Sequence, residues 1–238
     1  MLPLLILAGG FGSRLSSILG KKPKVLADID GISFLSIQIY AWRAQGIRTF
    51  IFLLHHKAAE IIEFLTLEMT KSLKDCIVQW VVEDAPLLTG GAVKNAINKL
   101  EITGDFILTN ADTWLGGGIL VLSKAQAPCV AVVNVKDMSR YGEVIFDNNS
   151  VVTSFSEKKG EQKQGWVNTG LLLLNSNLFS KFLKKSFSLE ELFLPALVSN
   201  KQLKVVNLQC VFFDIGTPDD YQKFLIFFKN SKKDAYES

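Results

Sequence analysis

The chain has 238 residues, of which 48% are hydrophobic and 21% are charged, and its formal net charge is +3. This length allows one large α/β domain or two small ones, and the composition is that of a globular protein with a sizeable core. The net charge is too small and too evenly spread to indicate a nucleic-acid partner. No apolar run approaches the roughly 18 residues of a membrane helix, and residues 1–8 lack the basic region of a signal peptide.

The three cysteines, Cys76, Cys129 and Cys210, are scattered along the chain. An odd and scattered count favours reduced thiols over a disulfide framework or a zinc site. We therefore expect a cytoplasmic protein without a membrane partner.

The first predicted strand, residues 4–8, opens into the loop Gly9-Gly10-Phe11-Gly12-Ser13-Arg14. Glycines have no Cβ, so backbone N–H groups here can approach an anion closely, and Arg14 and Lys24 add positive charge. The loop is neither a P-loop nor a dinucleotide fingerprint, because Leu15 stands where the latter needs a third small residue. The glycines alone fit a tight turn equally well, but the two cations favour a phosphate-binding loop.

Strands and helices alternate through the first half of the sequence. Apolar runs predict strands at 49–54, 77–82 and 106–109, and helical spacing predicts helices at 34–45, 57–71 and 92–100. This βαβαβαβ series predicts a Rossmann-like, doubly wound and mostly parallel sheet. In the second half, short polar links join the predicted strands, which indicates some antiparallel pairing; these strands are 129–135, 143–146, 151–155 and 167–174.

Helix-start signals mark the last third of the chain. Ser188 to Glu191 forms a capping box, and Thr217-Pro218-Asp219-Asp220 supplies a cap, a proline at the first position and acids in the first turn. The latter follows a predicted strand at 204–213. No linker marks a boundary, so we expect a single domain over residues 1–228 and a polar, frayed tail over 229–238.

Polar groups follow several predicted strands: Asn110-Ala111-Asp112, Glu157-Lys158 and Asp214. Ligands of open α/β sheets bind beyond the carboxyl ends of the strands. Two aspartates near a phosphate-binding loop predict a shared Mg²⁺, which commonly takes one or two carboxylates plus phosphate oxygens. Singly, each group has an ordinary explanation, since Asp214 could line a helix start and Lys158 could be a solvated lysine.

Glu83-Asp84 also ends a strand and precedes Gly90-Gly91, which open a predicted helix. Such glycines could admit a planar ring at close range. By itself, this segment fits an ordinary loop and helix start better.

Together these pieces resemble the sugar-1-phosphate nucleotidylyltransferases, or sugar-nucleotide pyrophosphorylases. The resemblance covers nearly the whole chain. Among the subfamilies, the sequence is most similar to the short D-glycero-D-manno-heptose 1-phosphate guanylyltransferases. Mannose-1-phosphate guanylyltransferases and N-acetylmuramate-1-phosphate uridylyltransferases are close behind. The motifs occur in the family's order: LAGGFGSRL (7–15), PK (23–24), EDAPLLTGGA (83–92), NADT (110–113), RYGEV (140–144), SEKK (156–159), VNTG (167–170) and DIGTPDDY (214–221).

The resemblance implies a role for each matching position. The nucleotide would contact a set of loop residues, namely Leu7, Ala8, Gly9, Gly10, Gly12, Ser13, Arg14, Lys24, Glu83, Thr89, Gly90 and Asn110. Among these, Lys24 would contact the α-phosphate, and Glu83 with Thr89-Gly90 would border the base. Asp112 and Asp214 would bind Mg²⁺. The sugar phosphate would contact Gly142, Glu157, Lys158, Asn168 and Thr169, with Lys158 on its phosphate group.

The implied reaction is attack of a sugar 1-phosphate oxygen on the α-phosphorus of a nucleoside triphosphate, with pyrophosphate leaving. The nucleophile is already ionised, so the enzyme needs no general base, and Arg14, Lys24 and Lys158 would neutralise charge. GTP is favoured by overall resemblance, and the family's products feed capsule or lipopolysaccharide biosynthesis. We expect a monomer or a small homo-oligomer.

The sequence departs from the family pattern at several positions. Ser13 replaces threonine, Val25 replaces a second proline, and Ala111 replaces glycine, which would place a methyl group beside the metal site. His55 and His56 have no assigned role. Three alternatives stay open: a UTP- or CTP-dependent member of the family, a catalytically inactive sugar-nucleotide-binding homologue, and a glycosyltransferase with an Asp-rich metal motif.

Overall fold

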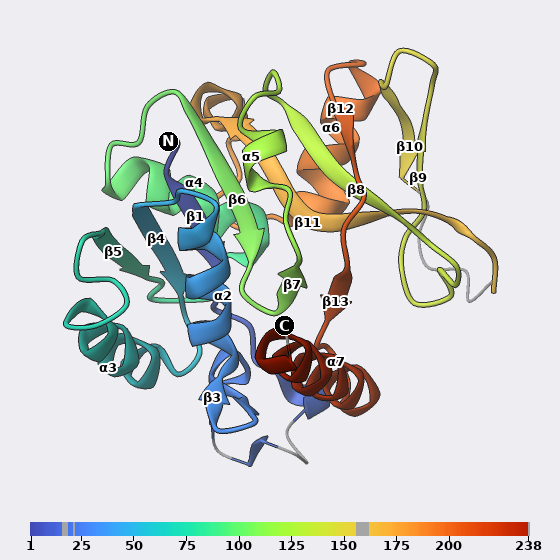
Figure 1. Ribbon diagram of the computed structural model, residues 1–238. Coiled ribbons are helices and arrows are strands. Elements are labelled where there is room, and N and C mark those ends of the chain that lie inside the picture. Colours follow the sequence, from blue (N-terminus) through green and yellow to red (C-terminus); the bar gives the residue numbers. More distant parts are fainter. Residues whose placement is uncertain (16–18, 21, 156–161, 238) are drawn as a thin grey trace.

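A seven-stranded sheet forms the centre of the computed structural model, which describes residues 1–15, 19–20, 22–155 and 162–237 (Figure 1). Its strand order is β12-β8-β11-β6-β1-β4-β5. The strands are β1 (Leu4–Leu7), β4 (Thr49–Leu54), β5 (Ile77–Val82), β6 (Asp105–Asn110), β8 (Cys129–Val135), β11 (Gly165–Asn175) and β12 (Lys204–Leu208). All neighbours are parallel except β11, which runs antiparallel to both β6 and β8. The predicted mostly parallel α/β sheet with antiparallel pairing in its second half is confirmed.

Helices cover both faces of this sheet, with α2 on the near side and α4 on the far side in Figure 1. One hydrophobic core joins the sheet to α2 (Phe34–Ala44), α3 (Ala58–Met69) and α5 (Ile119–Leu122). A second core joins the other face to α4 (Leu88–Lys99) and α6 (Leu194–Ser199). The strands supply both cores because successive side chains alternate between the faces.

A third core lies beneath the last helix, α7 (Pro218–Glu237), and includes Phe34, Ile215 and Phe224. The α7 N-terminus is capped as predicted, since the Thr217 hydroxyl accepts a hydrogen bond from the Asp220 amide at 3.4 Å. The helix continues through residues 229–237, where a frayed tail was expected. That segment contains neither glycine nor proline, so nothing in it interrupts the helix.

The predicted strand at 204–213 is wrong as a single element. β12 pairs with β8 in the main sheet, whereas β13 (Phe212–Asp214) pairs with β7 (Thr113–Leu115) in a separate two-stranded sheet. The chain leaves one sheet for the other at residues 209–211, and this change of partner ends β12. Two more strand pairs lie outside the main sheet, β2 (Asp28–Ile29) with β3 (Ile32–Ser33), and β9 (Val144–Phe146) with β10 (Val152–Phe155).

The described residues also form four short helical turns, η1 (Ser13–Leu15), η2 (Lys24–Leu26), η3 (Ser176–Lys181) and η4 (Leu189–Phe193). One half of the predicted capping box at the start of η4 is confirmed, since the Ser188 hydroxyl accepts a hydrogen bond from the Glu191 amide at 3.1 Å. Both η1 and η2 lie close to the loop that follows β1, and they position the charged residues of the site.

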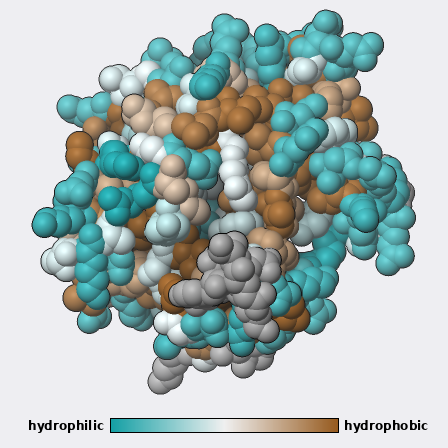
Figure 2. All heavy atoms as spheres, viewed as in Figure 1, coloured by the Kyte–Doolittle hydropathy of each residue, from teal (hydrophilic) through white to brown (hydrophobic). Residues whose placement is uncertain are grey.

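The surface in Figure 2 is largely hydrophilic around its rim, and hydrophobic side chains gather near its upper centre, in the region of α5. Within α5, Leu120 and Val121 are exposed. Among the helices that the structure describes, none combines the length and the apolar character needed to cross a bilayer. All three cysteines are free thiols, as predicted, and burial raises the pKa of Cys129 to about 11.

Candidate active site

A cavity of about 450 Å³ opens where β1, β4 and β6 end at their carboxyl sides. Its wall includes most of the residues that the sequence assigned to nucleotide binding: Leu7, Ala8, Gly9, Gly10, Gly12, Arg14, Lys24, Glu83, Thr89 and Asn110. It also includes Asp112, which the sequence assigned to Mg²⁺. The parallel pairing of β1 with both neighbours brings these separate segments to one edge of the sheet. Gly12 has φ of +63°, a conformation that glycine adopts without strain.

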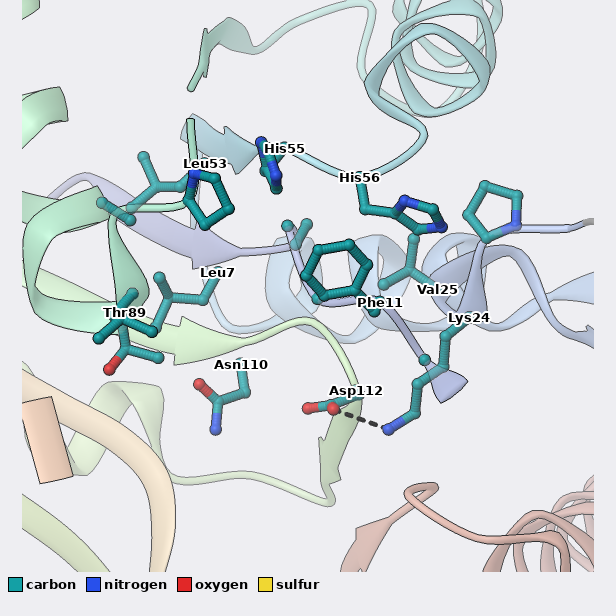
Figure 3. A pocket seen from close by; sticks show the side chains of 18 of the residues that line it. Leu7, Phe11, Lys24, Val25, Leu53, His55, His56, Thr89, Asn110 and Asp112 are labelled. Carbon is teal, nitrogen blue, oxygen red and sulfur yellow. Dashed lines mark hydrogen bonds and ion pairs between the residues drawn. The ribbon is translucent and has the colours of Figure 1, made fainter. Parts of the chain in front are cut away.

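Lys24 and Asp112 form the charged centre of the cavity, as Figure 3 shows. The Lys24 Nζ lies 2.7 Å from Asp112 Oδ2, and the lysine side chain is only 10% exposed. The turn η2 holds Lys24 in place, and a Cβ on Gly12 would come within 2.9 Å of the Lys24 Cβ. The glycine therefore allows the lysine to pack directly against the β1 loop.

Asp214 lies beside Asp112, although 102 positions separate them in sequence, because β13 pairs with β7. The register places Asp214 opposite Thr113, and the Ile215 amide donates to the Asp112 carbonyl at 3.0 Å. Burial raises the pKa of Asp214 above its ordinary value, and the Asp112 carboxylate raises it further, while Lys24 and then Arg14 act in the opposite direction.

These carboxylates have the donor chemistry that Mg²⁺ prefers, because both offer oxygen ligands and their mutual repulsion favours a cation between them. Within the described residues, no three His, Cys, Asp or Glu side chains gather into a site that could hold a metal alone. The two aspartates therefore fit an ion that shares its remaining positions with phosphate oxygens and water. Arg14 is close to the same place, since a Cβ on Gly216 would lie 3.0 Å from Asp214 Oδ1 and 3.4 Å from Arg14 Nη2.

Ala111 does not crowd this centre as the sequence led us to expect. Its side chain is fully buried in the first hydrophobic core, and its amide donates to the Leu7 carbonyl at 3.0 Å. Asn110, next to it, points to the cavity and lies against Gly170, where a Cβ would come within 2.5 Å of Asn110 Nδ2. Alternation along the chain thus sends the Ala111 methyl group into the core and its two neighbours toward the site.

The far wall of the cavity is the segment from Glu83 to Thr89. The Glu83 Oε2 accepts a hydrogen bond from the Leu87 amide at 2.9 Å. Burial raises the pKa of Glu83, while the Leu87 hydrogen bond and His55 lower it in part. The Thr89 hydroxyl donates to Glu190 Oε2 at 2.7 Å.

Gly90 does not contact the cavity, which corrects its predicted place beside the base. It lies inside α4, which begins four residues earlier than predicted, and a Cβ on it would lie 2.3 Å from the Phe187 ring. The Gly90 and Gly91 amides donate to the Phe187 carbonyl at 2.9 and 3.1 Å. Gly90 does admit a planar ring, but it is the ring of Phe187, and both glycines support the wall from behind.

Two aromatic contacts at the rim involve residues without a sequence-based role. The exposed Phe11 ring lies 5.0 Å from the His56 ring and 5.9 Å from the His55 ring, measured between centroids. In Figure 3, Phe11 lies between the two histidines and Asp112. All three line the cavity, as does Glu190. Phe11 belongs to the motif LAGGFGSRL but had no assigned role, and no motif identified the two histidines or Glu190 as parts of the site.

Among the predicted sugar-binding residues that the structure describes, Gly142, Asn168 and Thr169, none lines this cavity. Thr169 is buried, and its hydroxyl donates to the Ala131 carbonyl at 2.9 Å, so the side chain is not available to a ligand as predicted. Asn168 Oδ1 accepts from the Gly170 amide at 2.8 Å within a bulge of β11, and Gly142 lies in the segment before β9. Glu157 and Lys158 lie outside the described residues, and so does the side chain of Ser13.

Comparison with known proteins agrees with this geometry. Residues 4–230 match the family described as Nucleotidyl transferase. The chain is 34% identical over 224 residues to D-glycero-alpha-D-manno-heptose 1-phosphate guanylyltransferase of Campylobacter jejuni, which covers 93% of this chain and 98% of that protein. It is 30% identical over 225 residues to the protein of the same name from Aneurinibacillus thermoaerophilus, covering 92% and 95%.

A solved structure is also similar over its full length. The crystal structure of HddC from Yersinia pseudotuberculosis complexed with GMP-PN matches with a TM-score of 0.81 and 33% identity, covering 96% of this chain and 100% of that chain. The family match, the relatives and the Lys24–Asp112 centre all agree with the resemblance drawn from the motifs. The chain therefore belongs to the nucleotidyl transferase family.

Proposed function

We propose that this protein is a sugar-1-phosphate guanylyltransferase that joins GTP and a heptose 1-phosphate to give a GDP-heptose and pyrophosphate. The observation that carries the proposal is the ion pair of Lys24 with Asp112, beside Asp214, in the cavity that the β1 loop borders. Relatives named heptose 1-phosphate guanylyltransferases, 34% and 30% identical over nearly the whole chain, support the choice of base and sugar.

The chemistry requires two anions to meet, and the described residues supply the means. Lys24 would hold the α-phosphate, and Arg14, which lines the same cavity, would hold the outer phosphates. Asp112 and Asp214 would hold Mg²⁺, which when bound supplies further positive charge to the phosphate oxygens. The sugar phosphate is already ionised, so positioning and charge stabilisation account for catalysis without a general base.

We also propose which residues contact the sugar phosphate and which kind of biosynthesis uses the product. Glu157 and Lys158 would contact the sugar phosphate, in keeping with the motif SEKK, and the product would feed capsule or lipopolysaccharide biosynthesis in the cytoplasm. Asn168 and Gly142 would border the sugar ring.

A pyrophosphate-release assay across GTP, UTP, CTP and ATP, each with a panel of heptose and hexose 1-phosphates, tests the proposal. We expect GTP with a heptose 1-phosphate to give the highest kcat/KM, EDTA to abolish turnover, and added Mg²⁺ to restore it. Asp214→Asn should lose activity, whereas the matched control Asp219→Asn, an exposed acid outside the cavity, should keep it. Transfer of sugar from a nucleotide sugar without pyrophosphate release would instead indicate a glycosyltransferase, and GTP binding without turnover an inactive homologue.

A further inference from the structure

Glu190 has a position in the cavity that no sequence motif explained. It belongs to η4, which is far from the β1 loop in sequence, yet it lines the same cavity as Glu83 and Thr89. One of its oxygens, Oε2, accepts from the Thr89 hydroxyl at 2.7 Å and from the Ser188 hydroxyl at 2.9 Å. In the described part of the chain, its other oxygen, Oε1, has no hydrogen-bond partner.

Three further contacts tie the wall of the cavity to the segment that carries Glu190. The Leu189 amide donates to the Thr89 hydroxyl at 2.8 Å, and the Phe187 amide donates to the Leu87 carbonyl at 3.1 Å. In the other direction, the Gly90 amide donates to the Phe187 carbonyl at 2.9 Å. These bonds lie on both sides of Leu88 and fix the backbone beside Glu190, whose exposed carboxylate is held by the Thr89 and Ser188 hydroxyls.

Leu88 itself adopts a conformation that a branched side chain rarely takes, with φ of +61°. Such a residue costs on the order of 1–3 kcal/mol and persists only where its surroundings determine it, which occurs most often at ligand sites. Its side chain is exposed and lines the cavity. The strained wall and its hydrogen-bonded support therefore point to a surface that is built to contact a ligand.

The two carboxylates on this side of the cavity are acceptors. Glu83 and Glu190 each use Oε2 within the protein and leave Oε1 without a partner among the described residues. A carboxylate can only accept hydrogen bonds, so the wall matches a base edge made of donors. Guanine presents such an edge through N1–H and its 2-amino group, whereas uracil has one ring N–H between two carbonyl groups.

We propose that Glu190 is a base-specificity residue, whose Oε1 accepts a hydrogen bond from the 2-amino group of guanine while its Oε2 holds Thr89. The inference deepens the proposed function by assigning the recognition of the base to a named atom. Hypoxanthine differs from guanine only in lacking the 2-amino group, so the comparison of GTP with ITP isolates this single contact.

The test measures the Kd of GTP and ITP by calorimetry, without sugar phosphate, for the wild-type protein and three variants. Glu190→Gln keeps an oxygen for Thr89 and Ser188 but turns an amide donor toward the base. We expect it to weaken GTP binding about tenfold or more and to change ITP binding less than about threefold, as expected for the loss of a charge-assisted hydrogen bond. Glu191→Gln, the neighbouring exposed acid outside the cavity, is the matched control and should change neither.

Thr89→Val separates positioning from direct contact, because it releases the wall without removing the acceptor. We expect it to weaken GTP binding less than Glu190→Gln does, because the Ser188 hydroxyl still donates to Glu190 Oε2, and to change ITP binding less than about threefold. An equal effect of Glu190→Gln on both nucleotides would overturn the proposal, and so would a wild-type protein that binds GTP and ITP equally, a result that needs no variant to fold. Discrimination between the two nucleotides that is lost in Glu190→Gln, in a protein that makes no GDP-sugar, would refute the proposed function alone and would support the role of Glu190.

Discussion

Replacing Lys24 with methionine removes the cation of the charged centre and keeps most of the side-chain volume. The methionine retains the contact of its Cβ with the β1 loop at Gly12, so the variant should fold. What it loses is the ammonium group 2.7 Å from Asp112, in a side chain that is only 10% exposed.

The expected loss of kcat is large because the Lys24 side chain is so little exposed to solvent. Two unit charges about 4 Å apart interact with about 4 kcal/mol at an effective dielectric constant of about 20. Part of this attraction is already present when GTP binds, and only the part gained in the transition state affects turnover. We therefore expect kcat to fall at least about a hundredfold, which corresponds to about 2.7 kcal/mol.

The assay is steady-state pyrophosphate release with saturating GTP and sugar phosphate, together with thermal unfolding of each variant. Lys22→Met is the matched control, since Lys22 belongs to the same loop but is exposed and lies outside the cavity wall. We expect this control to retain near-wild-type kcat. Near-normal turnover of a folded Lys24→Met protein would refute both the placement of Lys24 at the reacting phosphate and the assignment of the site.

Three further substitutions test the packing around the site. Gly90→Ala should lower the free energy of unfolding by about 1–3 kcal/mol in urea, because its methyl group would overlap the Phe187 ring, although alanine favours a helix. Thr169→Val should cost about 1–2 kcal/mol by leaving a buried carbonyl unpaired, and KM for the sugar phosphate should stay unchanged. Arg140→Ala should cost about 1–2 kcal/mol, because the largely buried Asp220 loses its ion pair, which is partly screened by solvent at the arginine.

Each of these expectations has a result that would contradict it. Gly117→Ala, at a glycine with open space around it, is the control for Gly90, and equal effects of the two would argue against the overlap. A raised KM for the sugar phosphate in Thr169→Val would restore the role that the sequence assigned to that side chain. Unchanged stability of Arg140→Ala would mean that the Thr217 hydroxyl, 2.7 Å from Asp220, suffices as its partner.

Much of the fold could be predicted from local patterns. The strands at 49–54, 77–82 and 129–135 have the predicted bounds, because largely apolar runs of this length are typical of strands. The helix start at Thr217 was equally clear, since capping depends on neighbouring residues. The end of β12 could not be predicted, because the chain changes its pairing partner there and no local sequence signal marks that point.

Some residues of the candidate site could likewise be predicted from local motifs, and others could not. The β1 loop, Lys24 and Asp112 were identified correctly as parts of one cavity. The β1 loop and Asp112 follow the ends of strands, and Lys24 belongs to the short motif Pro23-Lys24. Thr169 and Gly90 were placed wrongly, because the direction of a side chain or the neighbour of a glycine depends on the packing of distant segments.

The sequence by itself determined the alternation of strands and helices, the glycine loop after the first strand and the charges that follow it, because these are properties of adjacent residues. Only the tertiary structure decided that Asp214 lies beside Asp112, that Phe187 fills the space at Gly90, and that Glu190 holds Thr89 across 101 positions of sequence. Contacts of this kind form when β13 pairs with β7 and η4 packs on α4, and they depend on hydrogen bonds between segments that are close only in the folded chain.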